Sequence, residues 1–498
     1  MKLLGLRLCE HDSNFSYYDG NSLRYHKTER FYQVKHHAVN DIFKWKEEIY
    51  SAWGITEADI DEIAIVVDAW KYEDCGFDRF FPAINWNFLN TNIPTTRLNH
   101  HYAHVLSNYE ARNITDVSIV IDGYGDYGVG HTVFKNNLIK DIGTIHRHGS
   151  LGIEMCMLAE SLGIKAENFV DLSGKLMGLQ SYGKLDKEFY NTTINNYGMY
   201  NLRELFSFQR WIEHKNSSVL ADHTKLDWIR TLHDAIGEIL LNYFKTFANK
   251  TDTINYSGGV AQNVIWNSKI RDYFPNLIIP PHCADDGLSL GAIEYLRIKN
   301  NISEFNLKEF PYSQNDISTE RVSDETIVKA AQALSENKVV AWYQNNGEVG
   351  PRALGNRSIL INASAKDAKE KINRIKNREQ YRPFGATVLE DYKDEVFYNL
   401  GKNPYMLYIG ETIDKEKYSA ITHVDGTSRA QTISEKENIS FYKLLKMFYN
   451  KTQIPVVLNT SLNIAGRPIA GNPQDAYHLY ETSDIDVLVI GNEYYEKN

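Results

Sequence analysis

Two short apolar stretches of this chain end in glycine-containing turns, and this pairing limits the folds open to it. Residues 117–121 are predicted to form a strand that runs into Asp122-Gly123, and the strand-like residues 253–255 precede Gly258-Gly259. Glycine lets backbone N–H groups approach an anion closely, and a helix beginning near Asn263 adds the positive end of its dipole. Both turns are therefore predicted to bind an anion, although neither contains the GxxxxGK[ST] pattern of a Walker A loop.

The repeated strand, glycine turn and helix predict an α/β chain whose first domain is a duplicated, actin/Hsp70-like nucleotide-binding fold. At 498 residues the chain is too long for one ordinary core. The apolar pattern thins near residues 300–325, where Asn and Ser accumulate, and a helix and a strand are predicted again at 325–336 and 339–343. We therefore expect one domain over 1–320 and a second over 321–498.

Three histidines lie within five residues, in Asn99-His100-His101-Tyr102-Ala103-His104. On a helix, His100 and His104 share one face, so that two imidazoles can converge on one cation. A further ligand must come from elsewhere, and Asp122 and Asp285 are the candidates. Imidazole and carboxylate together suit Fe(II), Mn(II) or Zn(II). The spacing alone is equally compatible with histidines that line a core helix.

Two other stretches of the first domain carry polar or aromatic groups in unusual numbers. His11 lies in a polar turn, residues 10–14, between two predicted strands, where a phosphate or a substrate hydroxyl could meet it. A plain turn without a function would have much the same sequence. Aromatic residues crowd into 70–88 without a regular period. They suit either a loop that stacks on a sugar or base ring or a satellite core.

The composition excludes several classes of protein. A net charge of −10 and a pI near 5.9 disfavour broad binding to duplex nucleic acid, which needs a basic face. The four cysteines have no CxxC spacing, so they predict neither a zinc ribbon nor a disulfide framework. The first residues turn polar too soon for a signal peptide, and no later stretch approaches a membrane span. We expect a cytoplasmic protein that does not contact a membrane.

Arginine and lysine recur near the predicted strand ends of the second domain. Guanidinium groups match phosphate oxygens bidentately, so basic residues interspersed with Gly, Ser and Asn in an acidic protein predict a phosphate pocket. A solvated basic surface is the alternative, but Pro351 and Pro383 fix backbone that such a surface does not need. The residues are Arg352, Arg357, Lys376, Arg378, Arg382 and Arg429.

Motifs spread over nearly the whole chain resemble one family. They are HHxxH from His100, DGxGD from Asp122, SGGVAQN from Ser257, DDGxxxGA from Asp285, GPRALGNRS from Gly350, KxRxxxRPF from Lys376 and VLNTSLN from Val457. In this order they resemble the NodU/CmcH O-carbamoyltransferases, which include tobramycin and cephem carbamoylating enzymes of the EC 2.1.3 type. The resemblance implies a first domain similar to Kae1, of the actin-like class, and a second similar to YrdC.

The resemblance also implies a reaction. Carbamoyl phosphate is expected to lose its phosphate in the YrdC-like domain, and the carbamate to pass internally to the Kae1-like domain. There it is expected to react with ATP to give carbamoyl-adenylate and pyrophosphate, before transfer to an acceptor hydroxyl. A metal is expected, iron by preference, with Mg²⁺ assisting at the triphosphate.

The residue roles that the resemblance implies fall into three groups. The metal ligands are His100, His104, Asp122 and Asp285, with Asp286 as the rival for the last place. The nucleotide contacts are Asp122, Gly123, Lys175, Gly258, Gly259 and Asn263, and Arg429 helps to hold carbamoyl phosphate. The catalytic residues are His11, which takes the acceptor proton, and Arg352, Lys376 and Arg382, which stabilise the departing phosphate.

The acceptor and the oligomeric state stay open, with a homodimer among the options. The chain is low in proline and rich in Asn, Ile, Lys and Tyr, a composition of AT-rich bacterial or phage genes, which favours a hydroxymethylated pyrimidine nucleotide or DNA over an antibiotic. A small molecule or a sugar is also compatible. Two alternatives are a tRNA threonylcarbamoylation enzyme and a nucleotide-gated binding protein. The first has another domain order and the second leaves the arginines without a purpose.

Overall fold

The computed structural model describes residues 1–67, 83–87, 89–205, 222–314 and 319–497. The chain divides into two compact units, and the division does not follow the sequence strictly. The first unit holds Met1–Leu23 and Ala38–Asn306, whereas the second holds Arg24–His37 and Leu307–Asn498. A short segment near the N-terminus, with β3 (Leu23–Lys27) and α1 (Thr28–Tyr32), therefore belongs largely to the second unit. The expected domains, 1–320 and 321–498, and the roles given to them stay predictions.

The first unit contains the same sheet plan twice. In one sheet the strands follow the order β2-β1-β4-β6-β5, and in the other β9-β8-β7-β10-β11. Along the chain, each sheet starts with an antiparallel pair, β1-β2 or β7-β8. The first strand of that pair, β1 or β7, also pairs in parallel with a later strand, β4 or β10. The strands are β1 (Leu3–Arg7), β2 (Asn14–Tyr18), β4 (Glu62–Val66), β5 (Ala83–Asn85), β6 (Thr95–Leu98), β7 (Val117–Ile121), β8 (Val129–Lys135), β9 (Leu138–Thr144), β10 (Ile254–Ser257) and β11 (Leu277–Ile278). This repetition confirms the duplicated, actin/Hsp70-like α/β fold.

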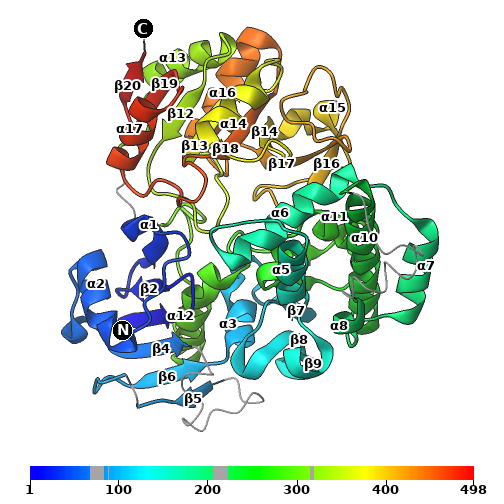
Figure 1. Cartoon of the computed structure of the whole chain (residues 1–498). Helices are drawn as coiled ribbons and strands as arrows, with labels where there is room; N and C mark the ends of the chain where they lie inside the picture. Colours follow the sequence, from blue (N-terminus) through cyan, green and yellow to red (C-terminus); the bar gives the residue numbers. More distant parts are fainter. Residues whose placement is uncertain (68–82, 88, 206–221, 315–318, 498) are drawn as a thin grey trace. The chain divides into compact units, whose positions relative to one another are not determined.

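Two helices of the first unit, α12 (Leu288–Lys299) and α3 (His100–Ser107), pack against each other beside its sheets. α12 packs on β1 and β4 and lies along α3 (Figure 1). Their approach is so close that a Cβ on Gly291 would collide with the carbonyl of Ala103. The remaining main helices are α2 (Trp45–Trp53), α5 (Leu151–Ser161), α6 (Leu172–Leu179), α7 (Lys187–Asn196), α8 (Leu202–Leu205), α10 (Asp222–Phe247) and α11 (Val264–Tyr273).

The second unit is a nine-stranded mixed sheet with helices on both faces. Successive residues of β12 alternate between two cores: Val340 and Trp342 pack with α13 and α16, and Ala341 and Tyr343 with α14 and α17. This alternation is that of a strand buried on both sides. The order is β15 (Phe397–Tyr398), β16 (Ile409–Thr412), β17 (Thr427–Ile433), β14 (Gly385–Leu389), β18 (Val456–Ser461), β13 (Arg357–Asn362), β12 (Val340–Tyr343), β19 (Val487–Ile490) and β20 (Glu493–Glu496), and the helices are α13 (Asp324–Ser335), α14 (Ala368–Lys376), α15 (Lys393–Val396), α16 (Ile439–Thr452) and α17 (Pro473–Thr482).

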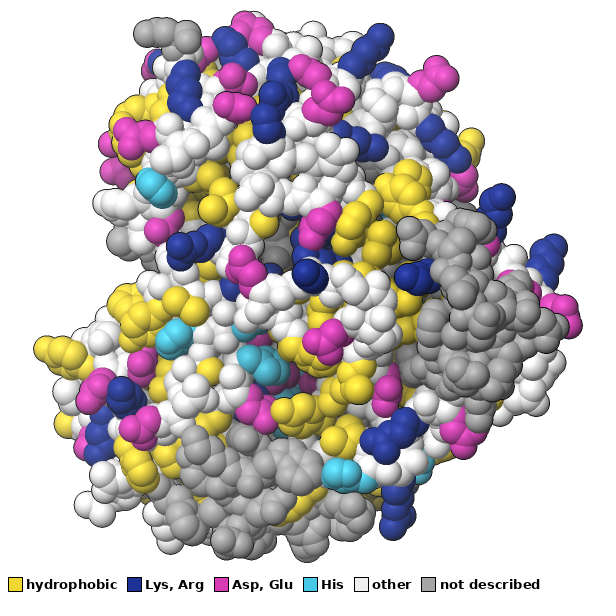
Figure 2. Space-filling view, in the orientation of Figure 1, with side chains coloured by type: hydrophobic (Ala, Val, Ile, Leu, Met, Phe, Trp, Pro, Cys, Tyr) yellow, Lys and Arg dark blue, Asp and Glu magenta, His cyan; other side chains and the backbone are white. Residues whose placement is uncertain are grey.

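The surface carries charges of both signs. On the face in view in Figure 2, Lys and Arg side chains are interspersed with Asp and Glu, as an acidic chain without a broad basic face requires. In the part of the chain that the structure describes, no helix has both the length and the hydrophobicity needed to cross a membrane. Most of the aromatic stretch at 70–88 lies outside the described residues. Trp86, which is described, is buried in a hydrophobic core of the first unit that includes Leu6 of β1 and Ile65 of β4.

Candidate active site

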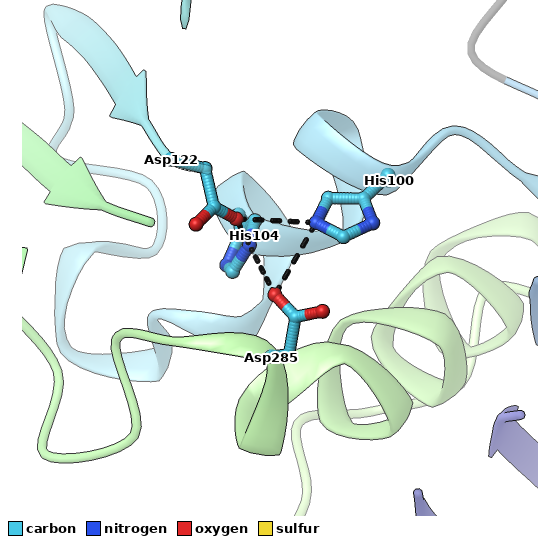
Figure 3. A group of neighbouring side chains, drawn as sticks. All are labelled: His100, His104, Asp122 and Asp285. Carbon is cyan, nitrogen blue, oxygen red and sulfur yellow. Dashed lines mark hydrogen bonds and ion pairs between the residues drawn. The ribbon is translucent and has the colours of Figure 1, made fainter. Parts of the chain in front are cut away.

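Four of the predicted ligands converge in the first unit (Figure 3). His100 and His104 project from one face of α3, whose N-terminus is capped by the side chain of Asn99. Asp122 follows β7 directly, and Asp285 begins the short turn that leads into α12. The packing of α12 along α3 thus brings Asp285 to the two histidines. Asp285, rather than Asp286, completes the group of four.

The donor atoms of this cluster are spaced as ligands of one ion would be. The Nε2 atoms of His100 and His104 lie 3.2 and 3.0 Å from Oδ2 of Asp122. They lie 3.3 and 3.5 Å from Oδ1 of Asp285. Donors that share an ion at about 2.1 Å are separated by about 3.0–3.4 Å. Two imidazoles and two carboxylates with this spacing therefore fit a divalent transition metal.

The four side chains of the cluster are buried, and each strongly affects the pKa values of the others. Burial and the charge of Asp285 oppose ionisation of Asp122, but hydrogen bonds with His100 and His104 outweigh them and hold its pKa below the usual range. The pKa of Asp285 is also lowered, because the imidazoles outweigh the effect of burial. Burial likewise opposes the charge on His100, yet the charge of Asp285 and the hydrogen bond with Asp122 raise its pKa to about 10. A bound cation would replace these imidazole protons.

The two glycine turns meet at Asp122. Because β7 and β10 are parallel neighbours, their carboxyl ends lie at one edge of the sheet. There Oδ1 of Asp122 accepts the N–H of Gly123 at 2.7 Å and that of Gly259 at 2.9 Å. Gly258 has a φ of 96°, and a Cβ there would collide with the carbonyl of Ile121. These turns therefore hold one oxygen of Asp122 and direct the other towards the histidines.

Asn263 and Lys175 have structural contacts of their own. Oδ1 of Asn263 caps α11 by accepting the N–H groups of Ile265 and Trp266, and its amide lies 3.0 Å from Nε2 of His233. Lys175 lies on α6, where its ammonium donates to the carbonyl of Lys165 at 2.5 Å. The nucleotide-binding roles of both residues stay predictions.

His11 lies beside the cluster. Its Nε2 is 4.0 Å from Oδ2 of Asp285, and its Nδ1 is 2.9 Å from Oδ2 of Asp12. Burial opposes its charge, but the hydrogen bond with Asp12 and the charge of Asp285 give a net rise in pKa. The loop is unusual because Cys9, Glu10 and Asp12 all have positive φ. Such backbone costs energy for non-glycine residues and is concentrated at functional sites.

Sequence reasoning missed the residues that support this cluster. Asp126 accepts the backbone N–H of His100 at 2.7 Å, and its other oxygen lies 3.3 Å from Nη2 of the buried Arg97. Arg7, which is also buried, lies 3.0 Å from Asp285. An arginine inside a predicted apolar strand was the signal available. His101, the middle histidine, turns instead to Thr132, with 2.8 Å between Nδ1 and Oγ1.

The second unit gathers five cations. Strand register places Arg429 opposite Gly385, which directly follows the segment of Arg378 and Arg382. The pKa of Arg429 is well below the usual range, mainly because the side chain is buried. The positive charges of Arg352, Arg378 and Arg382 lower it further. The Nε of Arg429 is buried without a hydrogen-bond partner among the described residues. This cluster is therefore suited to an anion.

Lys376 and Arg357 both donate hydrogen bonds to groups of the protein, but they have different surroundings. The ammonium of Lys376 donates to the Ser461 carbonyl at 2.6 Å, and burial followed by neighbouring positive charges lowers its pKa. Arg357 is fully buried, and its guanidinium donates to the carbonyls of Gln344, Asn345 and Asn356. Arg357 therefore supports the loop that precedes β13, whereas the anion cluster consists of Arg352, Lys376, Arg378, Arg382 and Arg429.

Comparisons with known proteins point to one family. The family model described as Carbamoyltransferase N-terminus matches residues 89–293, and Carbamoyltransferase C-terminus matches residues 331–497. Uncharacterized protein MJ1051 of Methanocaldococcus jannaschii is 32% identical over 431 residues, which are 79% of this chain and 81% of that protein. Nodulation protein NolNO of Sinorhizobium fredii is 29% identical over 81% of this chain and 64% of its own length. The 3'-hydroxymethylcephem-O-carbamoyltransferase of Streptomyces clavuligerus is 30% identical over 48% of each chain.

Proposed function

Because the chain belongs to the carbamoyltransferase family, we propose that it is an ATP-dependent O-carbamoyltransferase that uses carbamoyl phosphate. The observation that carries this proposal is that each compact unit has its own charged cluster. The first unit has the cluster of His100, His104, Asp122 and Asp285, which suits a metal. The second has the five cations around Arg429, which suit a phosphate.

In the second unit, the five cations would bind the phosphate of carbamoyl phosphate. Water adds to the carbamoyl carbon, the C–O bond to phosphate breaks, and carbamate and inorganic phosphate result. Arg352, Lys376, Arg382 and Arg429 would stabilise the charge on the departing phosphate. Burial, and after it the repulsion between neighbouring cations, lowers the pKa values of Lys376 and Arg429. This supports the assignment, because a bound dianion would stabilise both positive charges.

In the first unit, a carbamate oxygen would attack the α-phosphorus of ATP and displace pyrophosphate, giving carbamoyl-adenylate. The glycine turns at Gly123 and Gly259 are suited to the phosphates. His100, His104, Asp122 and Asp285 would hold a divalent metal, iron or a similar ion, which supplies Lewis acidity at the reacting nucleotide. Mg²⁺ would accompany the triphosphate.

The acceptor hydroxyl would then attack the carbamoyl carbon, and AMP would leave. His11 is suited to take the hydroxyl proton, because its ring lies beside the cluster and its partner Asp12 stabilises the protonated imidazole. We propose a small or nucleoside-like acceptor, with hydroxymethylated pyrimidine nucleotides or DNA tested first. A cytoplasmic location agrees with this substrate set.

The decisive experiment measures pyrophosphate release from ATP, with carbamoyl phosphate and with bicarbonate plus threonine as the rival carbamoyl source. Acceptors tested in parallel include hydroxymethylated nucleotides, hydroxymethylated DNA and aminoglycosides. Pyrophosphate that appears only with carbamoyl phosphate, and a product heavier by one carbamoyl group, would establish the reaction and identify the acceptor. Pyrophosphate release that does not depend on carbamoyl phosphate would contradict the proposal.

A further inference from the structure

An arginine is buried in the first strand of the chain, where apolar residues surround it. The side chain of Arg7 is 1% exposed, and its guanidinium lies 3.0 Å from Oδ2 of Asp285 and 3.5 Å from Oε2 of Glu10. Its Nη1 also donates to the carbonyl of Leu8 at 2.8 Å. A buried charge is costly unless it is paired and hydrogen-bonded. The placement of Arg7 is therefore determined by Asp285 and Glu10.

The contact with Arg7 divides the two oxygens of Asp285. Oδ1 faces His100 and His104, whereas Oδ2 faces Arg7. Asp122 is divided in the same way, because its Oδ2 faces the histidines while Oδ1 accepts the N–H groups of Gly123 and Gly259. Each carboxylate thus presents one oxygen to the cluster. Backbone donors hold the other oxygen of Asp122, but for Asp285 a side chain, Arg7, does so.

The same arginine reaches the loop that carries His11. Glu10, its second partner, accepts the hydroxyl of Tyr124 at 3.1 Å through Oε1. Glu10 and its neighbours Cys9 and Asp12 have positive φ, a backbone conformation that needs support from its surroundings. Tyr124 in turn lies two residues after Asp122. The chain of contacts from Asp285 through Arg7 and Glu10 to Tyr124 therefore closes around the cluster.

We propose that Arg7 is a positioning residue that fixes Asp285 as a one-oxygen ligand of the metal, with Glu10 linking it to the His11 loop. This inference rests on the proposed metal site. Residues that orient metal ligands typically contribute 10–100-fold to metal affinity. Electrostatics alone predicts the opposite sign, because removing a positive charge near a cation should strengthen its binding. The direction of the effect therefore distinguishes positioning from simple charge.

The test is a titration of the full-length protein with Co²⁺, followed by the visible absorption of the bound ion, which reports its ligand geometry. Variants Arg7→Met and Arg7→Lys are compared with Arg112→Met. Arg112 is the matched control, because it forms a partly buried pair with Glu294 in the same unit, at 2.5 Å. Circular dichroism and thermal unfolding establish that each variant is folded.

We expect Arg7→Met to weaken Co²⁺ binding about 10–100-fold and to change the absorption spectrum. Arg7→Lys, which keeps the charge but cannot contact Asp285, Leu8 and Glu10 together, should lose affinity and show the changed spectrum even if the Met variant does not fold. The Arg112 control should match the wild type. If the wild type binds Co²⁺ and the folded Arg7 variants bind it equally well or more tightly, with an unchanged spectrum, Arg7 does not position Asp285. If the wild type itself binds no Co²⁺, the metal site and this inference both fail.

Discussion

Gly259 donates its backbone N–H to Oδ1 of Asp122 at 2.9 Å, across the sheet edge where β7 and β10 end. This bond joins two turns that are 137 residues apart in the sequence. It leaves no room for a larger side chain, because a Cβ on Gly259 would lie 2.8 Å from the same oxygen. The position of Asp122 therefore depends on a glycine at 259.

We predict that Gly259→Ala weakens divalent metal binding at least about tenfold without unfolding the protein, because the new methyl group displaces the Asp122 carboxylate. Co²⁺ titration measures the effect. Gly198→Ala is the control, since a Cβ there meets no other atom within 4 Å. Equal affinities for the two variants would contradict the role given to this turn.

Asp122→Ala should abolish transfer to the acceptor while leaving cleavage of carbamoyl phosphate intact. The substitution removes a carboxylate that contacts both histidines, but it does not alter the cations of the second unit. Inorganic phosphate release and carbamoylated product are measured in the same reaction. Loss of both activities in a folded variant would show that the two clusters do not catalyse separate steps.

Arg382→Ala should instead reduce carbamoyl phosphate cleavage first, by about two to three orders of magnitude, as expected for a donor to a departing anion. Arg374→Ala is the control. It removes an arginine of the same unit whose side chain is 67% exposed and pairs with Asp484 at the surface. Phosphate release distinguishes the two, and an Arg382 variant as active as the Arg374 variant would rule out this assignment.

The stability of the first unit should fall as the pH drops from about 6.5 to about 4. Burial lowers the pKa of His131 to about 4 and that of His282 to about 4. In this pH range these histidines bind protons in the unfolded chain but not in the folded chain. Each histidine therefore lowers the free energy of unfolding by about 1.4 kcal/mol at pH 5.5 relative to neutral pH. His100 acts in the opposite direction, because its raised pKa in the folded chain adds stability as the pH falls through about 6.5, where the unfolded chain takes up the same proton. Its contribution cancels when a His131 variant is compared with the wild type.

Urea unfolding at pH 7.5 and pH 5.5 tests this expectation. His131→Gln should reduce the loss of unfolding free energy between the two pH values by about 1.4 kcal/mol. His146→Gln is the control, because it removes an exposed histidine of the same unit. If both variants have the wild-type pH dependence, His131 is not the group that titrates.

Local sequence was sufficient for the elements of the site. The strand predicted over 117–121 is β7, the helix expected near Asn263 is α11, and the strand expected at 339–343 is β12 less one residue. The convergence of His100 and His104 follows from helix geometry alone. These features depend on neighbours within a few residues, which is why periodicity and turn residues predict them.

Only the tertiary structure decided which distant residues join these elements. It brought Asp285 rather than Asp286 to the histidines, because α12 packs on α3 at the close approach that Gly291 permits. It also used Asn263 as a helix cap and Arg357 as a donor to carbonyls, and it placed Arg7 against Asp285. Contacts between residues so far apart arise from the packing of whole helices and strands, and no short-range pattern in the sequence encodes that packing.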